Sequence, residues 1–170
     1  LGFNYRITDF QCALGISQFR RLEQFLKRRE EIATRYDEAF ALLDDRVKLP
    51  RLSYDDRRHA WHLYVLRLRL NASPFGRRQF YELLWERGIK TQVHYQPVYQ
   101  HPFYRRLFRS KRISCPNAER YYDECISIPM FPSLSDADVG RVIAVIRELF
   151  SRYGKKLIGK KRGRVAESIV

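Results

Sequence analysis

The chain has 170 residues, of which 45% are hydrophobic and 14% aromatic, and a formal net charge of +14. This composition excludes a disordered chain, and the length suits one ordinary domain with its own core. No apolar run is long enough to span a membrane, and three scattered cysteines (Cys12, Cys115 and Cys125) are too few for a disulfide framework. We therefore expect a protein of the reducing cytoplasm. Because the chain begins with Leu1 and has one methionine, Met130, we also expect a piece of a longer protein.

The first predicted element is one long helix over residues 8–43. Thr8 followed by Gln11 is the capping-box pattern, and Gly15 weakens the helix enough to allow a bend. Such a length is typical of a helix that spans two domains or lines a partner. Its apolar residues recur at near-helical spacing: Phe10, Leu14, Phe19, Leu22, Leu26, Ile32, Tyr36, Ala39, Phe40 and Leu43.

Two strands are expected next, over residues 47–50 and 61–70. The second alternates apolar residues with His62, Arg67 and Arg69, which is the pattern of a half-buried strand with a wet face. Between the two strands lies a charged loop.

The following stretch, Gly88 to Tyr99, is the candidate ligand-binding segment. A helix beginning at Ser73-Pro74 ends at Gly88, which suits a left-handed position. Residues 89–95 then alternate, which predicts a short strand with Gln92 and His94 on one face. The pattern favours an ordinary edge strand with solvated polar residues over a grip on a polar ligand, and both interpretations stay open.

The last third predicts helices over residues 102–108 and 116–124, a strand over 125–129, and a final helix. Ser135, with Asp138 in the capping-box position, begins that helix. Its buried face is expected to comprise Val139, Val142, Ile143, Ile146, Leu149 and Phe150. The order of elements predicts an α+β fold, in which helices cover a small and mostly antiparallel sheet.

Basic charge concentrates at the C-terminal end, where residues 151–170 carry seven Lys or Arg and one acidic residue. We expect a domain over residues 1–154 and a disordered basic tail over 155–170, because the few apolar residues of the tail cannot bury a helix face. A basic surface attracts polyanions, so a nucleic-acid-binding module is one functional alternative. Against it, the aromatic residues lie at core spacings and no RNA-binding motif is present.

The residues alone predict no complete active site. The sequence holds no Gly-rich phosphate loop and no nucleophile elbow. His59 and His62 would lie on opposite faces of a strand, the cysteines lack metal-ligand spacing, and Asp55 with Asp56 fits a solvated turn. None of the eight lysines has apolar surroundings in the sequence.

Several short segments nevertheless follow the order and spacing of a known enzyme family. They are Leu1 to Gln11, Ala13-Leu14-Gly15, His62-Leu63-Tyr64, Gly88-Ile89, Gln92 to Tyr99 and Ile128-Pro129-Met130. Over residues 1–150 the chain resembles the DegT-type nucleotide-sugar aminotransferases, which are fold type I enzymes that use pyridoxal 5′-phosphate. The resemblance implies the C-terminal small domain, with the long helix as its connection. It is strongest to family members of pseudaminic acid biosynthesis, which move an amino group from L-glutamate to a UDP-4-keto sugar. Another 4-keto nucleotide sugar is the alternative substrate.

The resemblance also implies roles for individual residues. In the family, the residue matching Asn4 reaches across a homodimer with shared active sites, near the cofactor phosphate and the sugar nucleotide. Residues matching Gln92, Val93, His94 and Tyr95 line the sugar-nucleotide pocket. The Schiff-base lysine of the family lies upstream, in the large domain, and no lysine here matches its motif. The resemblance therefore implies a fragment that is inactive alone, with no catalytic residue or metal site, and no membrane or specific nucleic-acid partner.

Overall fold

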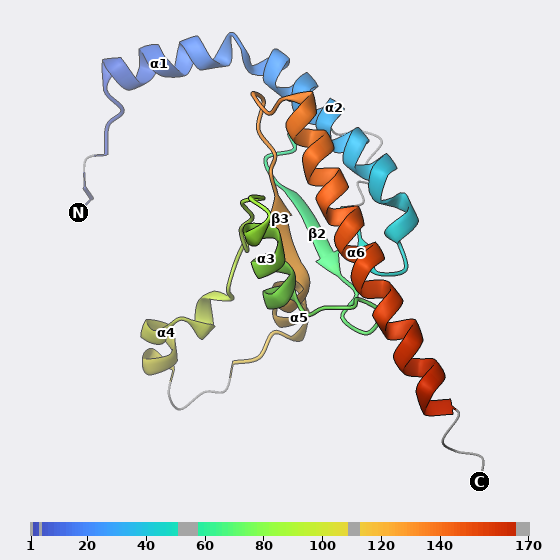
Figure 1. Ribbon diagram of the computed structural model, residues 1–170. Helices are drawn as coiled ribbons and strands as arrows, with labels where there is room; N and C mark the ends of the chain where they lie inside the picture. Colours follow the sequence, from blue (N-terminus) through green and yellow to red (C-terminus); the bar gives the residue numbers. More distant parts are fainter. Residues whose placement is uncertain (1, 4, 51–57, 109–112, 166–170) are drawn as a thin grey trace.

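The sheet at the centre of the molecule has three strands, all antiparallel, in the order β1-β2-β3. These are β1 (Val47–Lys48), β2 (Tyr64–Leu68) and β3 (Cys125–Ile128). The computed structural model describes residues 2–3, 5–50, 58–108 and 113–165, with side chains as far as Gly154. The α+β architecture and the antiparallel sheet expected from the sequence are confirmed (Figure 1).

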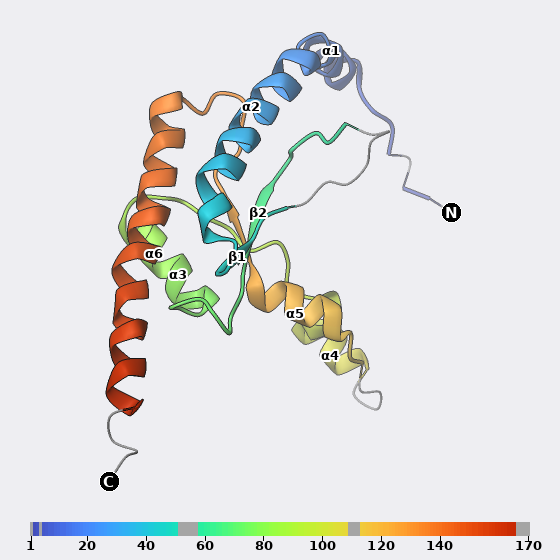
Figure 2. The same cartoon turned by 90° about the vertical axis from the view of Figure 1, so that its right-hand side faces the viewer.

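Helices account for most of the remaining described residues. They are α1 (Asp9–Phe19), α2 (Leu22–Phe40), α3 (Arg77–Glu86), α4 (Pro102–Leu107), α5 (Pro116–Glu124) and α6 (Asp136–Val165), with short 3-10 helices η1 (Ala41–Leu43) and η2 (Val98–Gln100). Figure 2 shows α2, α3 and α6 on one side of the sheet, with α5 and α4 toward the other.

The core lies between the sheet and the first of these helix groups. Tyr64, Leu66 and Leu68 alternate along β2 and are fully buried there. The hydroxyl of Tyr64 donates to Asp37 Oδ1 at 2.6 Å, and that of Tyr36 donates to the Pro129 carbonyl at 2.9 Å. Both buried phenols therefore have a partner, which removes the cost of burying an unpaired hydroxyl.

The opposite face of β2 is half-buried and carries an ion pair. Arg67 donates to Glu124 Oε2 of α5 from Nε at 3.1 Å and from Nη2 at 2.7 Å. Its guanidinium also lies over the Tyr121 ring. The arginine-rich face expected on this strand is thus confirmed, but α5 covers part of it.

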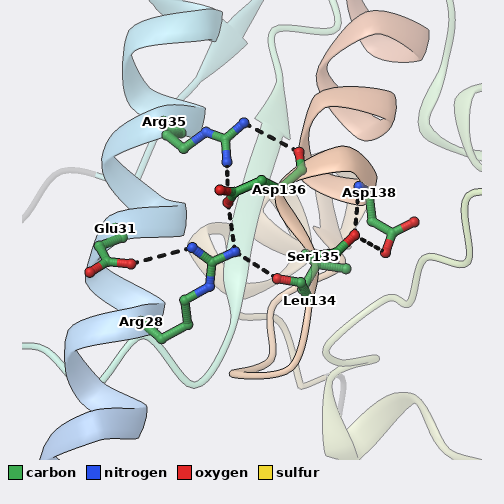
Figure 3. A network of polar contacts seen from close by, with 7 residues as sticks. All are labelled: Arg28, Glu31, Arg35, Leu134, Ser135, Asp136 and Asp138. Atoms are coloured by element: carbon green, nitrogen blue, oxygen red, sulfur yellow. Dashed lines mark hydrogen bonds and ion pairs between the residues drawn. The ribbon is translucent and has the colours of Figure 1, made fainter.

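Helices α2 and α6 are joined by a polar network at the start of α6 (Figure 3). Arg28 Nη2 and Arg35 Nη1 both donate to Asp136 Oδ1, at 2.8 and 2.6 Å. Arg28 also bonds the Leu134 carbonyl, and Ser135 accepts from the Asp138 amide as the predicted cap. The network ties the N-terminal end of α6 to α2.

The predicted helix over residues 8–43 is divided in the structure. Thr8 and Gln11 form the capping box, but the helix breaks at Arg20 and Arg21, not at Gly15. There the Arg21 amide bonds the Gln18 carbonyl, only three residues back, which ends α1 in a tighter turn. Figure 1 shows α1 turning away from the body at this point, while α2 continues along it.

Helix α3 starts later than predicted. Gly76 is its N-cap residue, while the Ser73 hydroxyl donates to the Phe75 carbonyl within the preceding turn. That turn places the Phe75 ring against Phe80 and Phe150 in the core. Burying the Phe75 ring in the core stabilises the chain more than beginning the helix at Ser73-Pro74 would.

The predicted helix end at Gly154 is wrong, because α6 continues through this residue to Val165. The disordered tail over residues 155–170 stays a prediction. An interior glycine costs a helix only about 1 kcal/mol and need not end it. The space beside Gly154 is used instead: a Cβ there would lie 2.8 Å from Arg46 Nη1, which donates to the Phe150 carbonyl.

Candidate functional site

The candidate segment begins at a well-defined helix end. Gly88 has φ +76°, its amide donates to the Trp85 carbonyl, and the Ile89 amide donates to the Leu84 carbonyl. This is the Schellman arrangement, which needs a left-handed residue at the glycine position. The Arg141 guanidinium also passes closely, 3.0 Å from where a Cβ on Gly88 would lie. The predicted role of Gly88 is confirmed.

The strand predicted over residues 89–95 is wrong. Only Gln92 bridges to β3, through its amide to the Ser127 carbonyl at 3.1 Å and its carbonyl from the Ser127 amide at 2.8 Å. Ile89 and Thr91 are buried in the core instead. The burial of Ile89 and Thr91 explains why apolar and polar residues alternate here. This alternation does not require residues 89–95 to pair with β3 along their whole length.

His94 is held against β3 by side chain and backbone. Its ring Nδ1 lies 2.8 Å from the Ser127 hydroxyl, and the Cys125 thiol donates to its carbonyl with a sulfur–oxygen distance of 3.6 Å. Burial raises the pKa of the Cys125 thiol, which keeps it protonated as a donor. The ring of Tyr95 stands edge-on to that of His94.

The four predicted pocket residues are adjacent in space but differ in exposure. Gln92 and Tyr95 are exposed, whereas Val93 and the His94 ring are half-buried. Gln92 and Ser127 are opposite partners in the antiparallel bridge, so their side chains lie on the same face, and the His94 ring contacts Ser127 there. Gln92 and His94 therefore share a face, as predicted, with the ring turned toward Ser127. Among the described residues, the side-chain amide of Gln92 and the phenol of Tyr95 have no hydrogen-bond partner, and they lie beside the anchored imidazole of His94.

The far end of the segment is tied to α5. The Tyr99 hydroxyl donates to Glu119 Oε1 at 2.7 Å and accepts from the Cys115 amide at 3.2 Å. Partial burial and the Glu119 carboxylate both raise the pKa of Tyr99, so the phenol stays protonated. The segment between Gly88 and Tyr99 is thus fixed at both ends, with its middle bonded to β3.

Sequence reasoning missed Ser127 and Cys125 as parts of this site. The available signal was their small polar side chains in the buried strand Cys125–Ile128. Two other predicted features, Asn4 and the Asp55-Asp56 turn, lie outside the described residues.

A separate groove lies over the second face of the sheet. It has a volume of about 750 Å³ and is lined by basic groups that include Lys48, His62 and Arg69. None of Gln92, Val93, His94 and Tyr95 lines it. The arginines Arg67 and Arg69 on its floor already bond Glu124 and Asp44, so we place the site at the segment and not in this groove.

The match to a family model decides what kind of protein this is. The model of the DegT/DnrJ/EryC1/StrS aminotransferase family matches residues 1–147. The chain belongs to this aminotransferase family. Its small antiparallel sheet with helical cover is accordingly part of a fold type I aminotransferase.

Individual relatives agree with the family. The spore coat polysaccharide biosynthesis protein SpsC of Bacillus subtilis is 41% identical over 149 residues, which are 87% of this chain and 38% of SpsC. The aminotransferase PseC of Helicobacter pylori, involved in the biosynthesis of pseudoaminic acid, superposes with a TM-score of 0.78 at 29% identity. That match covers 89% of this chain and 40% of PseC.

A further solved relative has been described in its PLP form. It is the sugar aminotransferase Spr1654 of Streptococcus pneumoniae, with a TM-score of 0.73 and 26% identity over 87% of this chain and 37% of Spr1654. The chain thus spans about two-fifths of the length of the relatives that it matches.

Proposed function

We propose that this domain forms the sugar-nucleotide side of the active site in a pyridoxal-phosphate-dependent sugar aminotransferase. The observation that carries the proposal is the segment from Gln92 to Tyr95. It is bonded to β3 at Gln92 and His94 and presents an amide, a phenol and an imidazole together. Pockets that recognise sugars need a few such polar groups in fixed positions.

For the substrate, we propose a UDP-4-keto-6-deoxy-N-acetyl sugar, with L-glutamate as amino donor, as in pseudaminic acid biosynthesis. The structural match to PseC supports this choice. Another 4-keto nucleotide sugar is the alternative, and the higher sequence identity to the polysaccharide protein SpsC supports it.

The cofactor is pyridoxal 5′-phosphate, which supplies the electron sink for amino transfer. The described side chains do not fit a site for its aldehyde: Lys27 and Lys90 are exposed, and Lys48 lies on an edge strand. We infer that the Schiff-base lysine and most phosphate contacts belong to the part of the enzyme outside this chain. Asn4 would add one contact near the phosphate.

We further propose a homodimer with shared active sites. Apolar side chains on α1 and before it are exposed, and no residue of α1 is buried. They are Phe3, Tyr5, Ile7, Phe10, Leu14, Ile16 and Phe19. A surface of this kind marks an interaction site, and a second subunit would cover it while receiving Asn4.

Other partner classes have less support. No helix among the described residues is both long and apolar enough to cross a membrane. Several of the paired aromatic rings, such as Tyr36 with Tyr64 and Phe75 with Phe150, are packed in the core and so cannot stack on bases.

The first experiment uses the complete aminotransferase that contains this domain. We expect pyridoxal absorbance and glutamate-dependent amination of the UDP-4-keto sugar, faster than that of other 4-keto nucleotide sugars. If the enzyme prefers a different nucleotide sugar, that sugar replaces the substrate proposed above. If it aminates none of them and binds oligonucleotides strongly and in a salt-dependent way, the proposed function is overturned.

A second experiment tests the shared site. The complete enzyme carrying Asn4→Ala is mixed with a variant that lacks the Schiff-base lysine. Heterodimers would contain one site with both residues intact, so we expect activity that neither parent has. If heterodimers form and activity stays absent, Asn4 does not act across the interface.

A further inference from the structure

Among the described residues, the Ser127 hydroxyl is the one hydrogen-bond partner of the His94 ring, and its neighbours along β3 are apolar. Ser127 is 5% exposed, between Ile126 and Ile128 in the middle of the buried strand β3. Its backbone amide and carbonyl are both used by Gln92, so the hydroxyl alone contacts the imidazole, at 2.8 Å from Nδ1. A buried hydroxyl at such a position costs free energy unless it is bonded.

The surroundings of Ser127 decide the direction of this hydrogen bond. Within the part of the chain that the structure describes, His94 Nδ1 is the one acceptor within hydrogen-bond distance of the Ser127 hydroxyl. If Nδ1 carried the proton and donated, the hydroxyl proton would be buried without a partner. The hydroxyl therefore donates to an unprotonated Nδ1, and the neutral imidazole carries its proton on Nε2.

The ring is also held in orientation. The Cys125 thiol bonds the carbonyl of His94, the Gln92 bridge fixes the backbone two residues earlier, and the Tyr95 ring packs edge-on to the imidazole. Because Nε2 lies across the ring from Nδ1, it faces away from Ser127. Among the described residues it has no hydrogen-bond partner, so its N–H is free for a ligand.

We propose that Ser127 is a positioning residue, which holds His94 as an Nε2–H donor toward an oxygen acceptor of the nucleotide sugar. The acceptor is a hydroxyl or phosphate oxygen. The inference rests on the proposed function, because it assigns the free N–H to the same sugar-nucleotide site.

The first test is spectroscopic and uses the 170-residue chain with ¹⁵N-labelled histidine, at a pH at which histidine is neutral. The signal of His94 is assigned by its loss in His94→Ala. We expect Nδ1 to be unprotonated, with the shift of a hydrogen-bonded acceptor, and Nε2 to be protonated. A protonated Nδ1 in the unmodified chain would overturn the proposal, and this result needs no further variant.

The matched variants are Ser127→Ala and Thr91→Val. Thr91 is also buried, and its hydroxyl has no partner among the described residues. We expect Ser127→Ala to move the Nδ1 resonance to that of a free ring nitrogen and Thr91→Val to leave it in place. If Nδ1 does not move in folded Ser127→Ala, the proposal is wrong. Ser127→Cys, which keeps the side-chain shape but donates weakly, should give an intermediate shift.

The second test is kinetic and uses the complete enzyme. Losing the bond that fixes the donor should raise the Michaelis constant for the nucleotide sugar by about two- to tenfold in Ser127→Ala, without changing that for glutamate. Thr91→Val should change neither constant. An increase in His94→Ala that Ser127→Ala does not share overturns the positioning role alone. No increase in either variant overturns both this role and the proposed site.

Discussion

Helices α1 and α2 follow one another in the chain, and both carry apolar residues at helical spacing, yet only α2 packs in this structure. Ile32, Ala33, Tyr36 and Phe40 of α2 are buried, whereas α1 buries none of its residues. Figure 1 shows the difference directly, since α2 lies beside α6 and α1 extends away from the body. An apolar stripe thus predicts that a face will be covered but does not tell which polypeptide covers it.

The largest expected effect separates the two helices by stability. Phe40 is fully buried and Phe10 is 90% exposed. In the 170-residue chain, Phe40→Ala should lower the free energy of unfolding by about 3–5 kcal/mol, because it removes a core ring and leaves a cavity. Phe10→Ala should change it by less than about 0.5 kcal/mol. Urea unfolding measures both values, and a large loss in Phe10→Ala would show that α1 packs on this chain in solution.

The next largest effect is on dimer formation in the complete enzyme, where α1 rather than α2 should be the sensitive helix. If a second subunit covers α1, Phe10→Ala should weaken the dimer by about tenfold, as expected for an aromatic residue that anchors an interface. The control is Leu42→Ala, since Leu42 is also mostly exposed, at 82%, but belongs to η1 on the body. Sedimentation over a dilution series would measure both dimers. Equal weakening in the two variants, or none, would argue against α1 as the interface.

What the sequence could predict follows the same division. Some features depend on residues close in the chain: the capping box at Thr8, the N-cap Ser135, the left-handed Gly88 and the buried face of α6. All four are confirmed. The antiparallel sheet could also be predicted from the order of elements, because short strands between helices permit few other arrangements.

What the sequence could not predict depends on distant contacts. Ile89 and Thr91 alternate like strand residues, but whether they pair depends on β3, more than thirty residues later, and β3 meets this segment at Ser127 only. Ser127 itself gives a weak signal, because one serine in a buried strand is ordinary until its partner His94 is known. The family resemblance was enough to find the segment from Gln92 to Tyr95. It could not predict that β3 holds this segment through Ser127 and Cys125.

A smaller effect concerns binding at the segment. In the complete enzyme, Gln92→Ala and His94→Ala each remove a neutral hydrogen bond, worth about 0.5–1.5 kcal/mol. The Michaelis constant for the UDP-sugar should therefore rise about two- to tenfold, with that for glutamate nearly unchanged. Gln79→Ala, at an exposed position of α3, is the matched control and should alter neither constant. Glutamate kinetics that shift as much as sugar kinetics would mean that the segment does not bind the sugar nucleotide.

The smallest expected effect is on the pH dependence of stability, and it compares two aspartates: Asp37 of α2, and Asp136 of α6, which bonds α2. Hydrogen bonds and charge from Arg28, and then from Arg35, lower the pKa of Asp136 below its ordinary value of 3.8. Its contribution to stability is therefore present above about that pH and is lost as the pH falls through the lowered pKa. Burial instead raises the pKa of Asp37 above 3.8, despite the hydrogen bond from Tyr64, so stability falls as the pH rises from there through the raised pKa.

Neutral variants of the two aspartates should consequently give slopes of opposite sign. Asp136→Asn should be less stable than the unmodified chain at neutral pH, and the difference should shrink toward about pH 3. Asp37→Asn keeps an oxygen that can accept from Tyr64, and it should gain stability relative to the unmodified chain as the pH rises over the same range. Urea unfolding at several pH values measures both differences. Because Asp136 is exposed at the surface, its effect should also weaken in high salt, whereas that of Asp37 should persist. Slopes of the same sign would show that the arginine pair does not hold the Asp136 carboxylate in solution.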